Sequence, residues 1–145
     1  MSDAGSGSSV IRVTRSATVS VPLRHAFDEA WRHTSALRGG TALLATIAGD
    51  ADGDVLSDLV AHDCLWVAHL GDTVRGFAVV RRRVIEGLWV DPHERRHGTA
   101  RTILAALASL PDAPLDAWAL PGDRATKSLY ENVGWRARLL TMRGA

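Results

Sequence analysis

The sequence predicts an α/β domain in which six to seven strands form one sheet flanked by helices. This fold class is predicted by strand-like and helix-like patterns of apolar residues and by one junction where a strand passes into a helix. Some segments alternate apolar and polar residues, and others repeat their apolar residues every three or four positions. Residues 84–90 are rich in β-branched and aromatic side chains, and Asp91-Pro92 ends this strand because proline cannot donate to a β-ladder. From Gly98 onward the pattern becomes that of a helix with one buried face. Its apolar stripe is Ala100, Ile103, Leu104, Leu107 and Leu110.

The remaining elements follow from the same patterns along the chain. The expected strands are residues 11–21 (one strand or two short ones), 64–70, 74–80, 84–90, 115–120 and 135–142. The expected helices begin at Pro22, before Leu43, at about residue 55 and after Asp123. Asp52 or Asp54 is expected to cap the third helix of the chain, and Gly134 to end the last. The final strand would leave an exposed sheet edge, which a second copy of the chain could cover as a homodimer.

Length and composition indicate a globular protein and exclude several classes of function. The 145 residues suggest one domain over residues 10–145, after a disordered Ser/Gly/Asp-rich segment at residues 1–9. A net charge of +1 argues against nucleic-acid binding. Cys64 is the single cysteine, so we expect no disulfide, and we predict no metal site. Because the sequence lacks an apolar run of about 20 residues and a signal-peptide core, we expect a cytoplasmic protein without a membrane partner.

The junction between the strand at 84–90 and the following helix has the composition of an anion-binding site. Arg95, Arg96 and His97 precede Gly98 at the start of the helix. The first N–H groups of a helix lack internal partners, and glycine lets the backbone approach an anion closely. A phosphate or pyrophosphate fits such a site. The alternative is an ordinary strand-to-helix connection whose arginines are solvated.

Two blocks of sequence resemble the GNAT N-acetyltransferase superfamily. Arg95-Arg96-His97-Gly98-Thr99-Ala100 resembles the family signature Arg/Gln-x-x-Gly-x-Gly/Ala, and Leu88-Trp89-Val90-Asp91-Pro92 resembles the strand before it. Residues 123–135, Asp-Arg-Ala-Thr-Lys-Ser-Leu-Tyr-Glu-Asn-Val-Gly-Trp, resemble a later helix of the family. The two blocks occur in the family's order and at its spacing. The resemblance covers residues 64–142 and implies a GNAT-type mixed, mostly antiparallel sheet.

The resemblance implies acetyl-coenzyme A (acetyl-CoA) as acyl donor. The backbone of Leu88 and Val90 would pair with the pantetheine arm, and N–H groups from Arg96 to Arg101 would hold the pyrophosphate. The donor-binding residues are then Leu88, Trp89, Val90, Arg95, Arg96, His97, Gly98, Thr99, Ala100 and Arg101. Three departures from the family pattern matter. Arg96 replaces a usual glycine, and Ala100 replaces the commoner glycine, a change that the family tolerates. Asp123 replaces a usual asparagine whose contact to pantetheine is thereby in doubt.

Glu86 and Tyr130 are the candidate catalytic residues. A carboxylate within an apolar strand is costly unless it is paired, and Glu86-Gly87 resembles a run in GNAT enzymes that acetylate aminoglycosides. Glu86 would act as the base, and Gly87 would permit a bulge or a close approach. The alternative for Glu86 is a salt bridge to Arg83 or another neighbour on the sheet. Tyr130 stands at the family's thiolate-protonating position and would point toward the sulfur; the alternative is a structural, half-buried tyrosine.

The resulting prediction is an acetyl-CoA-dependent N-acetyltransferase that acts on a primary amine of a small molecule by direct attack. By family analogy Trp31 and His33 would wall the acceptor site, although Trp31 as helix core is the competing interpretation. Two other functions stay open. One is acetylation of a protein or peptide amine, and the other is a non-catalytic coenzyme-A-binding regulatory protein on the same fold.

Overall fold

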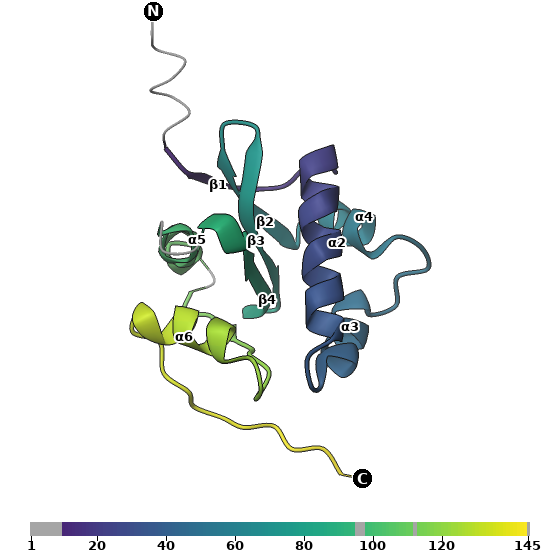
Figure 1. The fold of residues 1–145 in the computed structure, drawn as a ribbon, viewed down its shortest axis with the longest axis vertical. Coiled ribbons are helices and arrows are strands. Elements are labelled where there is room, and N and C mark those ends of the chain that lie inside the picture. Colours follow the sequence, from purple (N-terminus) through teal and green to yellow (C-terminus); the bar gives the residue numbers. More distant parts are fainter. Residues whose placement is uncertain (1–9, 95–97, 112, 145) are drawn as a thin grey trace, which may run out of the picture.

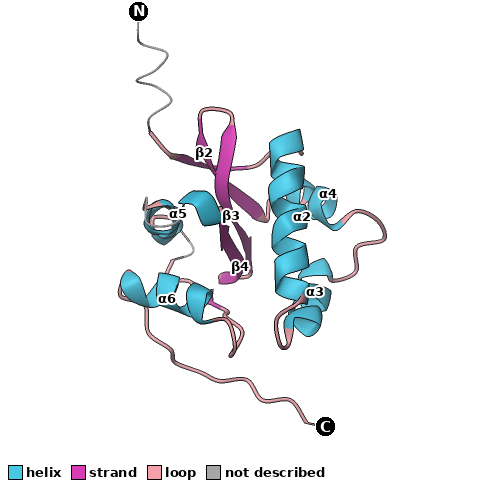
Figure 2. Cartoon of the chain, in the orientation of Figure 1, coloured by secondary structure: helices cyan, strands magenta, loops and turns pink. Residues whose placement is uncertain are grey.

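The computed structural model describes residues 10–94, 98–111 and 113–144, and its centre is one five-stranded sheet. The strands are β1 (Arg12–Arg15), β2 (Leu65–Leu70), β3 (Thr73–Arg81), β4 (Val84–Val90) and β5 (Asp116–Ala117). They lie in sequence order across the sheet. The first three pairings are antiparallel, whereas β4 and β5 are parallel (Figure 2). The predicted mixed, mostly antiparallel sheet is therefore confirmed.

Helices cover both faces of the sheet (Figure 1). One face carries α2 (Val21–Ser35), α3 (Gly40–Ala48) and α4 (Val55–Ala61). The other face carries α5 (Thr99–Ala108) and α6 (Arg124–Asn132), and the short 3-10 helix η1 (Pro92–Glu94) follows β4. Each face has its own apolar core. On the α2 face this core includes Leu23, Leu56, Leu59, Leu65, Val67 and Phe77, and on the α5 face it includes Ala78, Ile85, Ile103, Leu104 and Leu107.

Side-chain caps fix where three helices begin. The amide of Leu23 donates to the Ser20 hydroxyl over 3.2 Å at the start of α2. Asp54 accepts from the amide of Ser57 over 3.0 Å at α4, which settles the choice between Asp52 and Asp54. Asp123 accepts from the amide of Thr126 over 3.1 Å at α6. These bonds satisfy amides that the helix itself leaves unpaired.

The β3–β4 hairpin closes through a two-residue turn without glycine. Arg82 and Arg83 have φ values of 50° and 68°, so both are left-handed, as a type I′ turn requires. This conformation is costly for residues with a Cβ atom. The left-handed conformation of Arg82 and Arg83 is what allows the three consecutive arginines to join β3 and β4 without a longer loop.

The sheet is smaller than the six to seven strands expected from the sequence. The strand predicted at 115–120 is reduced to Asp116–Ala117, and residues 135–144 form no strand. An alternating pattern becomes a strand only where a neighbouring strand offers hydrogen-bond partners. The C-terminal segment instead runs past α6 (Figure 1), and the large apolar side chains after Trp135 are exposed, with Leu139 at 89% and Met142 at 80%.

Candidate active site

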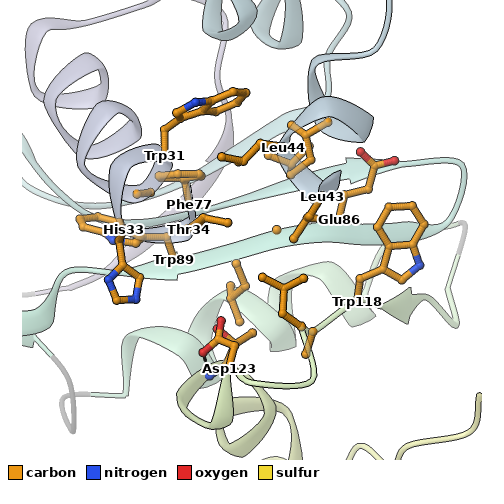
Figure 3. Close-up of a pocket in the computed structure, with 18 of the residues that line it drawn as sticks. Trp31, His33, Thr34, Leu43, Leu44, Phe77, Glu86, Trp89, Trp118 and Asp123 are labelled. Atoms are coloured by element: carbon orange, nitrogen blue, oxygen red, sulfur yellow. Dashed lines mark hydrogen bonds between the residues drawn. The ribbon is translucent and has the colours of Figure 1, made fainter. Parts of the chain in front are cut away.

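A cavity that is open to solvent lies between α2 and α3 on one side and the β5–α6 segment on the other, with β4 between them. Its wall is mainly apolar and aromatic (Figure 3). The aromatic lining residues are Phe27, Trp31, Phe77, Trp89 and Trp118, and the aliphatic ones include Leu43, Leu44, Ile47 and Leu120. The two acidic lining residues among those described are Glu86 and Asp123.

The cavity exists because β4 and β5 diverge. These strands pair only at Val84 with Asp116 and Ile85 with Ala117. Two backbone bonds of 2.9 Å join the segments, from the Asp116 amide to the Arg83 carbonyl and from the Trp118 amide to the Ile85 carbonyl. Beyond this point residues 87–90 and residues 118–120 line opposite walls. Within the described chain, the edge of β4 that faces β5 therefore lacks a neighbouring strand there, and its backbone can receive an extended ligand.

A β-bulge directs Glu86 into the cavity wall. Val79 pairs with Gly87 and Val80 with Ile85, so Glu86 is an extra residue on β4. Glu86 and Gly87 both face α3, because a Cβ on Gly87 would lie 3.7 Å from Ile47 Cδ1 and Glu86 is bound to a residue that contacts α3. Bulges of this kind re-aim side chains beside functional sites. Of the bulge or close approach that Gly87 was expected to permit, the structure has a bulge, at the neighbouring Glu86.

Glu86 is held by Arg81. Its Oε1 atom accepts hydrogen bonds from Arg81 Nε over 3.0 Å and from Nη2 over 2.6 Å. The same Nη2 donates to the carbonyls of Thr46 and Ile47 at the end of α3 over 3.0 and 2.8 Å. The Glu86 carboxylate raises the pKa of Arg81. Both bonds to Glu86 use Oε1, so Arg81 orients the carboxylate without holding its second oxygen.

The expected alternative of a salt bridge at Glu86 is thus present, with Arg81 rather than Arg83 as partner. The sequence signal for Arg81 was its place in a run of three arginines, which alone indicates only a solvated edge. In the structure Arg81 points toward α3, because it binds Glu86 at the bulge and the carbonyls at the end of α3. The role of Glu86 as the base in proton transfer therefore stays a prediction.

Tyr130 lies beside the cavity and is not among its lining residues. It is 6% exposed, and its ring stacks on Trp135 with centroids 5.4 Å apart. Its hydroxyl is buried and has no hydrogen-bond partner among the described residues. Burial, and to a lesser extent the charge of Asp123, raises the pKa of Tyr130. The preceding residue, Leu129, does line the cavity.

The start of α5 retains the features expected of an anion site. Gly98 is left-handed at φ 80° and makes no side-chain cap, so the N–H groups of the first turn receive no side-chain acceptor from it. Thr99 is 2% exposed, and its buried hydroxyl also lacks a partner in the described chain. Ala100 is buried, and Arg101 Nη2 donates to the Asn132 carbonyl over 3.3 Å. Arg95, Arg96 and His97 lie outside the described residues.

The structure brings most of the other predicted site residues to one cavity. Trp31, His33, Leu88, Trp89 and Val90 all line it together with Glu86. Trp31 also packs against the core of the α2 face, so this residue is both part of the cavity lining and part of the helix core.

Sequence reasoning missed Phe77 and Trp118 as lining residues. Trp118 had a weak signal, as an aromatic residue near the end of a short strand. Phe77 had none, because a buried aromatic in a central strand is typical of any core.

The described residues exclude two further classes of feature, a membrane-spanning helix and a metal centre. No helix there is long and apolar enough to cross a membrane. No group of three His, Cys, Asp or Glu side chains there is placed to hold a metal ion.

Similarity to known proteins lies in the fold. No protein-family model matches the sequence, and no curated protein matches it. The solved structure of AAC(6')-Iy with the bisubstrate analogue CoA-S-monomethyl-acetylneamine aligns with a TM-score of 0.55 and 17% identity, covering 94% of this chain and 99% of that one. An integron cassette protein from the mobile metagenome of V. cholerae aligns with a TM-score of 0.49 and 16% identity over 92% of this chain and 93% of its own. The chain has the GNAT fold that its two sequence blocks implied.

Proposed function

We propose that this protein is an acetyl-CoA-dependent N-acetyltransferase that acetylates a primary amine of a small molecule. The observation that carries the proposal is the cavity formed where β4 and β5 diverge, with Glu86 set into its wall by a bulge. The similar fold of AAC(6')-Iy, solved with a bisubstrate analogue containing CoA, supports acetyl-CoA as the donor.

The donor would extend along the free edge of β4. There the backbone of Leu88 and Val90 would pair with the pantetheine arm, and Trp89 would lie beside it. The pyrophosphate would bind at the start of α5, where the left-handed Gly98 leaves the amides of the first turn without a side-chain cap. The buried, unpartnered hydroxyl of Thr99 supports a ligand at this helix end.

The reaction would proceed by direct attack. The amine nitrogen forms a bond to the thioester carbonyl carbon, the carbon–sulfur bond breaks, and the amine proton leaves. Glu86 would accept that proton through the oxygen that Arg81 does not hold, and a β4 backbone amide at Leu88 or Val90 would stabilise the carbonyl oxygen. Tyr130 would protonate the departing thiolate. Its unpartnered hydroxyl supports this role, because no described group competes for the proton.

A second function has its own support. Glu86 is paired with Arg81, and Tyr130 is buried outside the cavity lining. Both facts fit a protein that binds coenzyme A on this fold without turnover. The two functions make different predictions for the same variants.

Titration calorimetry with acetyl-CoA and free CoA, followed by thiol release with a panel of amines, separates them. In the catalytic case Glu86→Gln and Tyr130→Phe should each lower kcat by about 10²- to 10⁴-fold, the usual contribution of a positioned acid or base. Donor affinity should be unchanged. Glu29→Gln makes the same chemical change at an exposed position of α2 and should leave kcat unchanged.

The other outcomes are equally informative. Micromolar donor binding without thiol release for any amine would favour the CoA-binding protein. If acetyl-CoA does not bind at millimolar concentration, both functions are wrong.

A further inference from the structure

We infer that the cavity selects a monoamine whose amine is carried on an aromatic body, and that it discriminates against polycationic amines. This inference rests on the proposed function and names the acceptor class of the same site. It differs from the acceptor half of the analogue bound to AAC(6')-Iy, an acetylneamine.

The acceptor side of the cavity is an aromatic wall. Phe27 on α2 contacts Trp31 with ring centroids 5.6 Å apart and Phe77 on β3 with centroids 5.7 Å apart. Phe77 in turn stacks on Trp89 of β4 at 5.6 Å and 26°. Four rings from three elements thus form one continuous aromatic surface, in which Trp31 and Trp89 are half-buried and Phe27 and Phe77 are buried. Such a surface favours a flat apolar group, which gains both burial and ring–ring contacts.

The lining carries few carboxylates for a polycation. Glu86 shares its charge with Arg81 through Oε1, which leaves its second oxygen outside that pair. Asp123 accepts from the Thr126 amide over 3.1 Å and from its hydroxyl over 2.7 Å as the cap of α6, and both donors are neutral. The described lining therefore offers two carboxylates, one of which is already paired with an arginine. An amine with several ammonium groups would lose the hydration of more charges than these carboxylates can pair.

The arrangement of these groups also sets the shape of the ligand. Figure 3 shows Trp31, Phe77 and Trp89 toward one end of the cavity and Glu86 toward the other, with Leu43 and Leu44 between them. An amine at Glu86 can place an aromatic ring on this wall only if a linker joins the two. An arylalkylamine has this form.

The test compares three acceptors by thiol release from acetyl-CoA: phenethylamine, ethylamine and neamine. Phenethylamine adds a ring to ethylamine at constant charge, and its kcat/KM should exceed that of ethylamine by about tenfold or more, as expected from burial of a ring. Neamine should have the lowest kcat/KM. A kcat/KM for neamine equal to or above that of phenethylamine would overturn the inference while leaving the proposed function intact.

Trp31→Ala tests the wall itself. It should lower the ratio of kcat/KM for phenethylamine to that for ethylamine by about tenfold, because it removes one ring of the surface. Trp66→Ala removes a tryptophan from the opposite face of the sheet and should leave the ratio unchanged. The ratio does not depend on the fraction of folded protein, so partial unfolding of either variant cannot imitate the effect. An unchanged ratio in Trp31→Ala would contradict the inference.

Binding measurements keep the inference separate from catalysis. Calorimetry of phenethylamine and neamine into the protein saturated with CoA needs no turnover. Tighter binding of phenethylamine without acetylation of any amine would overturn the proposed function and support the selectivity of the cavity. Failure of phenethylamine both to bind and to react would overturn the inference.

Discussion

The two walls of the cavity are anchored very differently. On the acceptor side, α2 buries Leu23, Ala26, Phe27 and Ala30 in a core shared with α3, α4 and the sheet. On the donor side, α6 buries only Tyr130, and β5 is two residues long. Regions with few buried apolar contacts open at lower free energy than well-packed ones. We therefore expect the wall proposed for the acceptor to be a fixed surface, and the wall proposed for the donor to adjust when a ligand enters between β4 and β5.

The walls meet where two loops approach each other. A Cβ on Gly39, between α2 and α3, would lie 3.5 Å from Leu120 Cδ2, in the β5–α6 segment. The α2–α3 corner therefore lies close to the β5–α6 segment at the side of the cavity away from Arg81. The same substitution should therefore lower the free energy of unfolding more on the acceptor side than on the donor side.

The largest difference is expected for glycine to alanine. Gly40 begins α3, and a Cβ there would lie 1.8 Å from the Thr34 carbonyl oxygen of α2. Because the obstacle is backbone, the α2–α3 corner must move, and we expect Gly40→Ala to lower the free energy of unfolding by about 4 kcal/mol, above the usual range for overpacking. Gly122, in the loop before α6, has nothing within 4 Å of the same position. Gly122→Ala should stay within about 0.5 kcal/mol of the parent in urea unfolding.

Equal costs at the two glycines would show that the α2–α3 corner is mobile. The acceptor wall would then not be the fixed surface described above.

Leucine to alanine should give a smaller contrast of the same sign. Leu23 on α2 is 2% exposed, and its truncation leaves a cavity in a closed core, at a cost of about 3 kcal/mol. Leu129 on α6 is half-buried at the cavity wall, so solvent can replace the lost atoms and the cost should be about 1 kcal/mol. Both free energies of unfolding can be measured by urea denaturation with a common slope. A cost at Leu129 equal to that at Leu23 would mean that α6 is anchored as firmly as α2.

Local signals in the sequence were sufficient for much of this architecture. The strand Val84–Val90 and the helix Thr99–Ala108 follow from residues close in sequence. Local signals also limited the cap of α4 to Asp52 or Asp54 and allowed a bulge at Gly87. Turn chemistry, capping and periodicity act over a few residues, so a sequence pattern can specify them. The resemblance to the GNAT family, and for Glu86 also the cost of a carboxylate in an apolar strand, indicated Trp31, His33 and Glu86 as site residues, and these line one cavity.

Features that depend on distant parts of the chain were not predictable in this way. The alternating residues 135–142 lack a strand beside them, and Arg81 meets Glu86 only because α3 offers the carbonyls of Thr46 and Ile47. Phe77 becomes part of a cavity wall only because β4 and β5 separate. Each depends on tertiary packing, which overrides local preference.

The smallest expected effect on stability concerns the donor side and runs in the opposite direction. The hydroxyl of Tyr130 is buried without a described partner, so Tyr130→Phe removes a polar atom that gains nothing from folding. The variant should be as stable as the parent at neutral pH, or more stable by up to about 1 kcal/mol. A loss of more than about 1 kcal/mol would mean that the hydroxyl has a partner in solution.

The pH dependence provides the sharper measurement. The pKa of Tyr130 is raised in the folded protein, so above a pH of about 10 the unfolded chain loses this proton while the folded chain keeps it. The stabilisation by this group is therefore complete below that pH and is lost as the pH rises further. Urea unfolding at increasing alkaline pH should show a steeper decline for the parent than for Tyr130→Phe. Because Tyr130 is the only tyrosine in the sequence, tyrosinate absorbance reports directly on its titration. Titration at the ordinary pKa would show that water reaches the hydroxyl, and hence that α6 opens far more readily than α2.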